Sequence, residues 1–357
     1  MQSPFSLPMT TLAGLRLIFD FTPARPEALS FSAYAAMDEA ARHSFDEARL
    51  FWLRSGMRVN TLAQRRADRD LVRIMRSNRL AYSGRGGLIV NGPPVHGKTE
   101  IALTLARRVE ARRAKAEPRY RTLGEAPVVW VDAPSNTSGK ALMAAICSFF
   151  TPDLPVPARW TTPRVFDEAI KRMRDARTQL LVIDEAHRLA SRPNGDHGDP
   201  TDMIKEIQNQ SPATVVLTGV NMLGTEVFGT PRGQQVIRRC DIIQLGPGTN
   251  STADAATEWE DLVAAFDAAL PLCDHAPGLL TANSTNLLTA TAGRLGDLAT
   301  LMRRLVEGIV NDPDRTDEHV TPQRLADTLM ACALASGSDK TSAPSARVIG
   351  KALKSAA

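Results

Sequence analysis

The stretch GLIVNGPPVHGKTEIALTLARRVE, residues Gly87 to Glu110, decides the fold of this chain. It begins with a short apolar run, passes through a glycine-rich turn and continues with apolar residues at helical spacing. The turn, Gly92 to Thr99, fits the phosphate-loop pattern G-x-x-x-x-G-K-[ST] in full, and it has the strand before it and the helix after it that this pattern requires. The stretch therefore predicts a strand, a phosphate-binding loop and a helix.

The residue types of this loop suit a nucleotide and a metal ion. Backbone N–H groups from about Val95 to Thr99 can converge on phosphate oxygens at the start of the helix. Lys98 would place a positive charge between the β- and γ-phosphates, and the Thr99 hydroxyl would coordinate Mg²⁺. We expect ATP and Mg²⁺ as cofactors, with nucleotide contacts along the loop at Gly92, Pro93, Pro94, Val95, His96, Gly97, Lys98, Thr99 and Glu100.

A second motif, QLLVIDEAH, ends at His187. A carboxylate at the end of a buried strand is costly unless it acts on an ion. Asp184 is therefore expected to hold Mg²⁺ through water, and Glu185 to orient the attacking water. His187 could report the nucleotide state, but a structural imidazole is the favoured interpretation.

The letters DEAH are also a helicase signature. A helicase of that kind needs a second motor domain with its own motifs. Only about 170 residues follow His187, and they contain the run LTGVN where such a helicase has an S-A-T-like motif. The motif therefore indicates an ATPase with a single nucleotide domain.

Composition places the chain among globular proteins. Of its 357 residues, 43% are hydrophobic and 23% are charged, and the net charge is +4. No apolar run reaches the length of about 18 residues that a membrane-spanning helix needs. The four cysteines form no CxxC pair and suggest no zinc site, so we expect buried thiols in a reducing compartment, the cytoplasm.

Positive charge is concentrated in the first third of the chain. Eleven arginines and no lysine lie between Arg42 and Arg85, and a second basic cluster, RRVEARRAKAEPRYR, spans Arg107 to Arg121. Such clusters form solvated helix faces or contact a polyanion. Both interpretations stay open on the sequence alone.

The spacing of hydrophobic residues changes along the chain and predicts five segments. Short apolar runs that alternate with helical patterns after Gly86 indicate a parallel sheet covered on both faces. Beyond Pro247 the pattern is helical throughout. The expected boundaries are a flexible arm over 1–30, an Arg-rich helical segment over 31–80, a nucleotide-binding domain over 81–250, a helical lid over 251–335 and a basic flexible tail over 336–357.

The series NGPPVHGKT, LLVIDEAHRLA, ATVVLTGVN and QQVIRRCDIIQL, followed by a helical lid, resembles an AAA+ ATPase over roughly Arg79 to Ala335. The resemblance implies a five-stranded parallel sheet in the order 5-1-4-3-2 and Mg-dependent ATP hydrolysis, slow and stimulated by DNA or a partner. It also implies a sensor at Thr218, with Asn221 as second choice. An arginine finger at Arg239, or at Arg238, would act on the neighbouring subunit's ATP, and the active form would be a homo-oligomer, either a ring or a helical filament.

The lid phrase TAGRLGDLATLMRRL resembles the family's second-sensor helix, with the pattern G-x-x-R. Counting from Gly293, the arginine position holds Gly296. Either Arg294 substitutes from a neighbouring turn, or this lid senses nucleotide poorly.

Within AAA+ proteins, the chain is most similar to transposition regulators of the TniB and TnsC kind. The similarity lies in the Arg-rich helical segment before the core, in LLVIDEAHRL and in the lid phrase TATAGRLGDLATLMRRLVEGIV followed by HVTPQRL. It implies assembly on duplex DNA and recruitment or activation of a DDE transposase. The loop SNTSGK would then bring Thr137, Ser138 and Lys140 to DNA phosphates, although an ordinary helix-capping loop fits equally well.

Two other functions remain open at this stage. One is a helicase loader or another AAA+ ATPase of replication, which would prefer single strands or a helicase partner. The chain has no evident helix-turn-helix reader after the lid, which disfavours an origin-binding initiator. The other is a nucleotide-gated scaffold, in which ATP only switches a binding surface.

Overall fold

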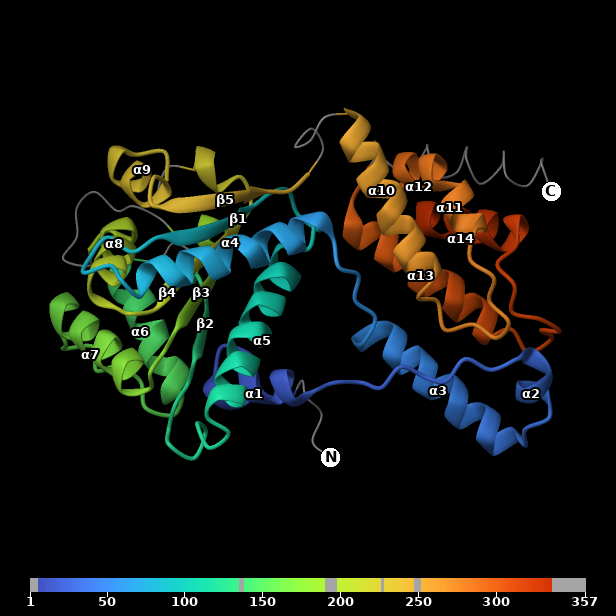
Figure 1. Ribbon diagram of the computed structural model, residues 1–357, viewed down its shortest axis with the longest axis horizontal. Helices are drawn as coiled ribbons and strands as arrows, with labels where there is room; N and C mark the ends of the chain where they lie inside the picture. The colour runs from blue at the N-terminus through green and yellow to red at the C-terminus, as the bar shows by residue number, and fades with distance from the viewer. Residues whose placement is uncertain (1–5, 135–137, 190–197, 226–227, 247–251, 336–357) are drawn as a thin grey trace. The chain divides into compact units, whose positions relative to one another are not determined.

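The computed structural model describes residues 6–134, 138–189, 198–225, 228–246 and 252–335, without the side chains of 252–255 and 333–335. The chain folds into two compact units, and each is built from two separate stretches of sequence. The sheet unit contains the described residues of 1–21 and 62–245, and the helical unit contains those of 22–61 and 246–357. Figure 1 labels the elements of both.

Five parallel strands organise the sheet unit. Their order across the sheet is β2-β3-β4-β1-β5, and every neighbouring pair is parallel. This is the expected order 5-1-4-3-2 counted from the opposite edge, so the predicted topology is confirmed. The strands are β1 (Gly87–Asn91), β2 (Val128–Asp132), β3 (Leu180–Asp184), β4 (Thr214–Gly219) and β5 (Cys240–Gln244).

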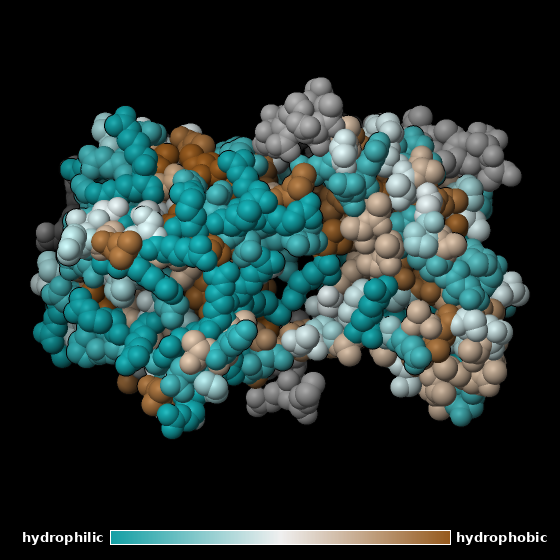
Figure 2. All heavy atoms as spheres, viewed as in Figure 1, coloured by the Kyte–Doolittle hydropathy of each residue, from teal (hydrophilic) through white to brown (hydrophobic). Residues whose placement is uncertain are grey.

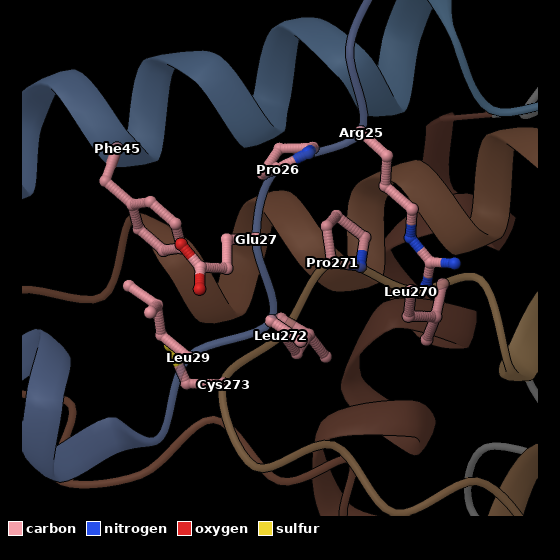
Figure 3. Close-up of a pocket in the computed structure, with 10 residues that line it drawn as sticks. Arg25, Pro26, Glu27, Leu29, Phe45, Leu270, Pro271, Leu272 and Cys273 are labelled. Atoms are coloured by element: carbon pink, nitrogen blue, oxygen red, sulfur yellow. The ribbon is translucent and has the colours of Figure 1, made fainter.

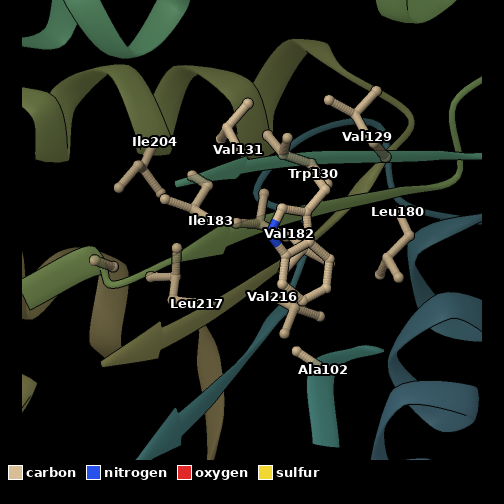
Figure 4. Close-up of a cluster of buried hydrophobic side chains, with 14 of the residues drawn as sticks. Ala102, Val129, Trp130, Val131, Leu180, Val182, Ile183, Ile204, Val216 and Leu217 are labelled. Atoms are coloured by element: carbon tan, nitrogen blue, oxygen red, sulfur yellow. The ribbon is translucent and has the colours of Figure 1, made fainter. Parts of the chain in front are cut away.

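Helices cover both faces of this sheet, which is why its strands are almost wholly apolar. Trp130 of β2, Val182 of β3 and Val216 of β4 lie in one buried cluster (Figure 4). The chain crosses from β1 to the far edge at β2 and then returns, and right-handed crossovers put the outgoing and returning helices on opposite faces. The outgoing face has α4 (Leu62–Asn78) and α5 (Lys98–Ala116), and the returning face has α6 (Gly139–Phe150), α7 (Thr162–Asp175), α8 (Pro200–Gln210) and α9 (Pro231–Ile237).

Residues 12–20, which fall within the expected flexible arm, form helix α1 (Leu12–Asp20) of the sheet unit. Leu15 is 1% exposed. The Arg16 guanidinium donates to the Glu125 carbonyl over 2.8 Å, and Asp20 pairs with Arg121 at 2.7 Å. These contacts fix α1 on the surface beside α5 and β2.

Residues 22–30, the rest of the expected arm, lie along the helical unit. The Arg25 guanidinium donates to the Ala268 carbonyl over 3.2 Å and lies over the Trp52 ring. Figure 3 shows residues 25–29 beside Phe45 and the segment 270–273, where they border a small pocket.

The expected Arg-rich segment, 31–80, divides between the two units. Helix α3 (Glu39–Ser55), preceded by the short α2 (Phe31–Ala35), buries Leu50 and Leu53 in the core of the helical unit. Helix α4 buries Leu71 and Ile74 against the sheet. The apolar stripe of each helix therefore selects a different core.

The helical unit is completed by helices after the sheet: α10 (Thr252–Asp267), α11 (Leu279–Ala282), α12 (Ser284–Thr291), α13 (Leu295–Val310) and α14 (Pro322–Ala335). Among the helices that the structure describes, none combines the length and the apolar character needed to cross a bilayer.

An ion network is buried inside this unit. The Arg49 guanidinium donates to both oxygens of Glu318, at 2.5 and 2.6 Å, and neither side chain is exposed. Asp46 and Arg315 extend the network, and Tyr34 lies under both guanidinium groups. Burial alone would lower the pKa of Arg49, but Glu318 and Asp46 raise it above its usual value. Arg49 is therefore a fixed charge of the core.

Candidate nucleotide site

The phosphate loop connects the carboxyl end of β1 with the start of α5. Gly92 has no room for a side chain, because a Cβ there would lie 2.8 Å from Leu245 atoms. Gly97 precedes α5 with φ 79°, and Val95 has φ 66°. A β-branched residue rarely adopts this left-handed backbone, so Val95 marks a strained turn of the kind found at ligand sites.

Lys98 is held within this loop. It is 7% exposed, and its Nζ donates to the Pro93 carbonyl over 2.6 Å. Burial lowers the pKa of Lys98, while the charges of Glu185 and Asp184 act against this shift. An ammonium has three N–H donors, so donors remain for phosphate oxygens.

The other predicted contact residues form the surface around Lys98. Nδ1 of His96 lies 2.7 Å from the Pro94 carbonyl oxygen, which closes the middle of the loop. Pro94, Val95, Thr99 and Glu100 are exposed. The loop is thus open on the side where the motif expects phosphates.

Thr99 and Asp184, predicted as magnesium ligands from motifs 85 residues apart, are in direct contact. The Thr99 hydroxyl donates to Asp184 Oδ2 over 2.9 Å. Asp184 is 5% exposed, and its Oδ1 accepts from the Thr218 hydroxyl and from the Glu185 N–H. Mg²⁺ prefers oxygen ligands and binds through one or two carboxylates plus substrate phosphates, so this pair fits the ion. No cluster of three or more His, Cys, Asp or Glu that could hold a metal occurs in the described part of the chain.

Glu185 stands at a turn that leaves β3. Its φ is 54°, and it precedes the short 3-10 helix η1 (Ala186–Arg188). This left-handed residue turns the chain sharply after Asp184. The Glu185 side chain remains about one-third exposed, beside Arg188 at 3.8 Å. It is thus positioned next to the Asp184 carboxylate and open to solvent.

One nitrogen of His187, Nδ1, lies close to two neighbouring groups. The Val220 N–H donates to Nδ1 over 3.2 Å, and Glu185 Oε2 lies 3.3 Å from the same atom. Because Nδ1 accepts from Val220, it has no proton to give Glu185 at the same time. His187 therefore holds the turn after β4, and in this arrangement it makes no hydrogen bond to the Glu185 carboxylate.

Asp132, which the sequence analysis did not single out, lies at the end of β2 directly opposite Asp184. Burial raises the pKa of Asp132, and the charges of Asp184 and Glu185 raise it further, although a hydrogen bond from Trp130 lowers it. The signal was present in the sequence, because VVWVD ends in an acid just as LLVID does.

The sensor candidates occupy the end of β4, between the strands of the two motifs. Thr218 is fully buried and bonds to Asp184. Asn221 is exposed, with φ 46°, at the start of the short 3-10 helix η2 (Met222–Gly224). Asn91, also missed from the sequence, accepts from the Met222 N–H over 2.8 Å and so holds this turn beside the phosphate loop.

Arg239 lies at the other end of the sheet. It precedes Cys240, the partner of Gly87 at the start of β1, whereas the phosphate loop follows the end of β1. Four residue steps of a strand separate these ends by about 13 Å. The Arg239 guanidinium donates to Asn209 Oδ1 over 3.0 Å, whereas Arg238 is exposed and has no recorded partner among the described residues.

The structure describes two of the three residues that are expected to face DNA. Thr137 lies outside the described residues. Ser138 caps α6 by accepting from the Ala141 N–H, as the helix-capping interpretation expects. Lys140 donates to the Ala158 carbonyl over 3.2 Å.

The second-sensor position lies in the helical unit. Gly296 is in the first turn of α13 and has no side chain to offer. Arg294, the possible substitute, pairs with Asp297 at 2.5 Å. Both residues thus lie at the start of α13, within the helical unit.

Several solved structures are similar to this chain. ORC2 of Aeropyrum pernix has 15% identity and a TM-score of 0.47, over 83% of this chain and 68% of that chain. The RuvB branch migration motor of Thermotoga maritima has 14% identity and a TM-score of 0.42, over 77% and 72%. Hsp104 has 15% identity and a TM-score of 0.44, over 81% of this chain and 44% of that chain, so this chain spans less than half of Hsp104.

No curated protein matches the sequence. The family model described as bacterial TniB protein matches residues 51–246. This range is more than half of the chain and includes all five strands. The matched residues include the phosphate loop and the Asp184 motif. The chain belongs to the TniB family of transposition-associated AAA+ ATPases.

Proposed function

We propose that this chain hydrolyses ATP with Mg²⁺ while assembled on duplex target DNA, and that it recruits or activates a DDE transposase. One observation supports this above others. The Thr99 hydroxyl bonds to the Asp184 carboxylate beside Glu185, in a chain of the TniB family. Two distant motifs thereby make one site with a place for the metal and a carboxylate for the water.

The residues at this edge of the sheet have separate roles in the proposed reaction. Lys98 and the N–H groups of the loop hold the phosphates, and Thr99 with Asp184 holds the metal. Mg²⁺ supplies neutralisation of the charge that develops on the transferred phosphoryl group. Glu185 accepts a hydrogen bond from the attacking water and aims it, and Thr218 keeps the Asp184 carboxylate in one orientation.

Glu185→Gln tests hydrolysis. The amide keeps the shape of the side chain but is a poor acceptor for the water's proton. We expect ATP binding to be retained and phosphate release to fall by about 100-fold or more. Unchanged release would remove Glu185 from this role, and assembly without any hydrolysis in the parent chain would support the scaffold alternative.

His187 is a positioning residue for the turn after β4, the strand whose Thr218 bonds to the Asp184 carboxylate. The contact with the Val220 N–H uses Nδ1, and an asparagine amide reaches about as far as Nδ1, whereas a glutamine amide reaches about as far as Nε2. We expect His187→Asn to retain kcat and His187→Gln to lower it by about tenfold or more, with KM little changed. Equal kcat for both variants would show that the contact of Nδ1 with Val220 does not affect hydrolysis.

DNA contact would use positive charge at the surface of the sheet unit. Lys140 lies at the start of α6, and α4 exposes the arginines discussed below. Such contacts go to phosphates and give no base specificity. We expect gel shifts of duplex DNA that require Mg·ATPγS at low salt. Preference for single strands, with capture of a replicative helicase, would favour the helicase-loader alternative.

A further inference from the structure

The chain passes between the two compact units three times, after Phe21, after Thr61 and after Leu245. Helix α1 belongs to the sheet unit, although the segment 22–61 that follows it belongs to the helical unit. The first of the three connections therefore depends on α1. A docked α1 makes this connection a restraint between the units, whereas an undocked α1 would be only a chain end.

This first connection is short, because the chain is held on both sides of Thr22. On the sheet-unit side, the Arg107 guanidinium of α5 donates to the Phe21 carbonyl over 3.4 Å. On the helical-unit side, Pro23 packs against Gly56, where an added Cβ would lie 2.7 Å from Pro23 Cγ. The Cα atoms of Phe21 and Pro23 are at most about 7 Å apart in any conformation of the chain. The connection therefore has almost no slack while both anchors hold.

The contacts of α1 are few enough to open separately from the rest of the sheet unit. Leu15 is the only buried apolar side chain in the described residues before Thr22, and Leu12 and Phe19 are partly buried against the same core. Short terminal elements with so little burial open at a lower free energy than the whole domain. The neighbouring surface over α4 and α5 is mostly hydrophilic (Figure 2), so on the face shown a released α1 finds no comparable apolar site.

The place where α1 docks lies away from the other two connections. The second connection meets the sheet unit at the start of α4 and the third at the end of β5, and Arg73 of α4 pairs with Asp241 of β5. Arg16 of α1 bonds instead to Glu125, just before β2 (Figure 1). Strands β2 and β5 are the two edges of the sheet, about 19 Å apart. A body held at two neighbouring places can rotate about the line that joins them, and a third attachment away from that line resists this rotation.

We propose that α1 is a reversible clasp that limits rotation of the helical unit about the other two connections. Docked α1 closes the clasp through the anchors on both sides of Thr22, and its release opens the clasp by turning α1 into a free end. Helix α5, which holds Phe21 through Arg107, also begins at Lys98 of the phosphate loop. The clasp thus ties the helical unit to the helix that this loop opens. It requires no nucleotide, DNA or transposase, so its failure and that of the proposed function are independent.

Lengthening the first connection tests the clasp without changing either anchor. Eight glycine and serine residues inserted between Phe21 and Thr22 would span about 16 Å on average. The control has the same insert between Leu154 and Pro155, in the connection between α6 and α7, which lies within the sheet unit.

Distance distributions between two spin labels measure the rotation in the full chain. The labels are placed through non-canonical amino acids at Leu80 of the sheet unit and Arg304 of the helical unit, which are both exposed. We expect the parent chain and the control insert to give the same width. The insert after Phe21 should broaden the distribution by at least about 5 Å, roughly one-third of its average span.

A substitution that undocks α1 should have the same effect. Leu15→Asp places a carboxylate in the apolar core, and the matched control Leu7→Asp changes a leucine that is 43% exposed. We expect amide exchange of residues 14–20 to rise at least about tenfold in Leu15→Asp, with exchange of strands β1 to β5 unchanged. Its distance distribution should broaden as it does with the insert, whereas Leu7→Asp should match the parent.

The clasp is overturned if the parent is as broad as the variant with the longer connection, or if the control insert broadens the distribution equally. It is also overturned if the amides of α1 exchange in the parent as fast as those of an unstructured peptide. Faster exchange of the strands in Leu15→Asp would show damage to the sheet unit, and the insert after Phe21 would then decide alone.

Discussion

Helices α3 and α4 are neighbours in the chain, have 17 residues each and both carry arginine, yet only α3 buries one. Arg49 of α3 is completely buried between Glu318 and Asp46. The arginines of α4 all point to solvent: Arg65, Arg66, Arg69, Arg73 and Arg76. A count of arginines therefore says little about their role until their surroundings are known.

The difference comes from what each helix packs against. The apolar stripe of α3 turns Arg49 inward, where a buried guanidinium is tolerated only with paired carboxylates. The stripe of α4 faces the sheet and leaves its basic face outside. Only some of that face is neutralised locally, for example by Asp70, which pairs with Arg66 and Arg73 at 3.7 Å.

The largest expected effect is on stability. Arg49→Leu removes the guanidinium that bonds to both oxygens of the buried Glu318 and leaves Arg315 as its remaining cation, so the helical unit should lose about 3 kcal/mol. The matched change on α4, Arg69→Leu, should alter stability by less than about 0.5 kcal/mol. Urea unfolding followed by hydrogen exchange of peptides from each unit measures both. Similar midpoints for the two variants would remove the contrast between the helices.

An intermediate effect is expected on DNA binding. Arg69 and Arg76 have no recorded protein partners among the described residues. If α4 contacts phosphates, Arg69→Ser/Arg76→Ser should reduce the slope of log affinity against log salt by about 2. The control is Arg54→Ser on α3, where the exposed arginine pairs with Glu307. An unchanged slope in the double variant would show that the basic face of α4 is solvated and does not bind DNA.

The smallest effect concerns pH. Burial raises the pKa of the Cys273 thiol, next to Arg49, to about 12, and Glu318 adds to the shift. An unfolded thiol ionises near pH 8.5. Between about pH 8.5 and about 12 the folded state therefore keeps the Cys273 thiol proton that the unfolded state loses. This contribution to stability is complete below about pH 8.5 and is lost as pH rises toward 12. Cys273→Ala should therefore flatten the decline of the urea midpoint between about pH 8 and 10. An equally steep decline in the variant would assign that decline to other groups.

Much of the sheet unit could be predicted from sequence because its signals are local. A phosphate loop between a strand and a helix, and an acid at the end of the next motif strand, place the carboxyl ends of β1 and β3 at the same edge of the sheet. The resemblance to AAA+ proteins then supplied the strand order, which the structure confirms. Asp132 escaped notice although its strand ends in the same way, because no known motif includes it.

The helical unit was harder to predict because its decisive contacts are distant in sequence. Arg49 and Glu318 are 269 residues apart, and no local pattern connects them. Helix α1 was missed for another reason. It has only nine residues, and its stability depends on the Thr11 cap and on burial of Leu15 against the rest of the unit.

The division of the chain into interleaved units also has a consequence for its synthesis. A ribosome adds roughly 5–20 residues per second. Arg49 therefore leaves the ribosome on the order of half a minute before Glu318, its buried partner, has been made. During that time the whole sheet unit is produced, while α3 still lacks its core and its counter-ion. Residues 22–61 thus remain with Leu50, Leu53 and Arg49 unburied until the helices after the sheet have been made, and exposed apolar surface of this kind favours aggregation of a nascent chain.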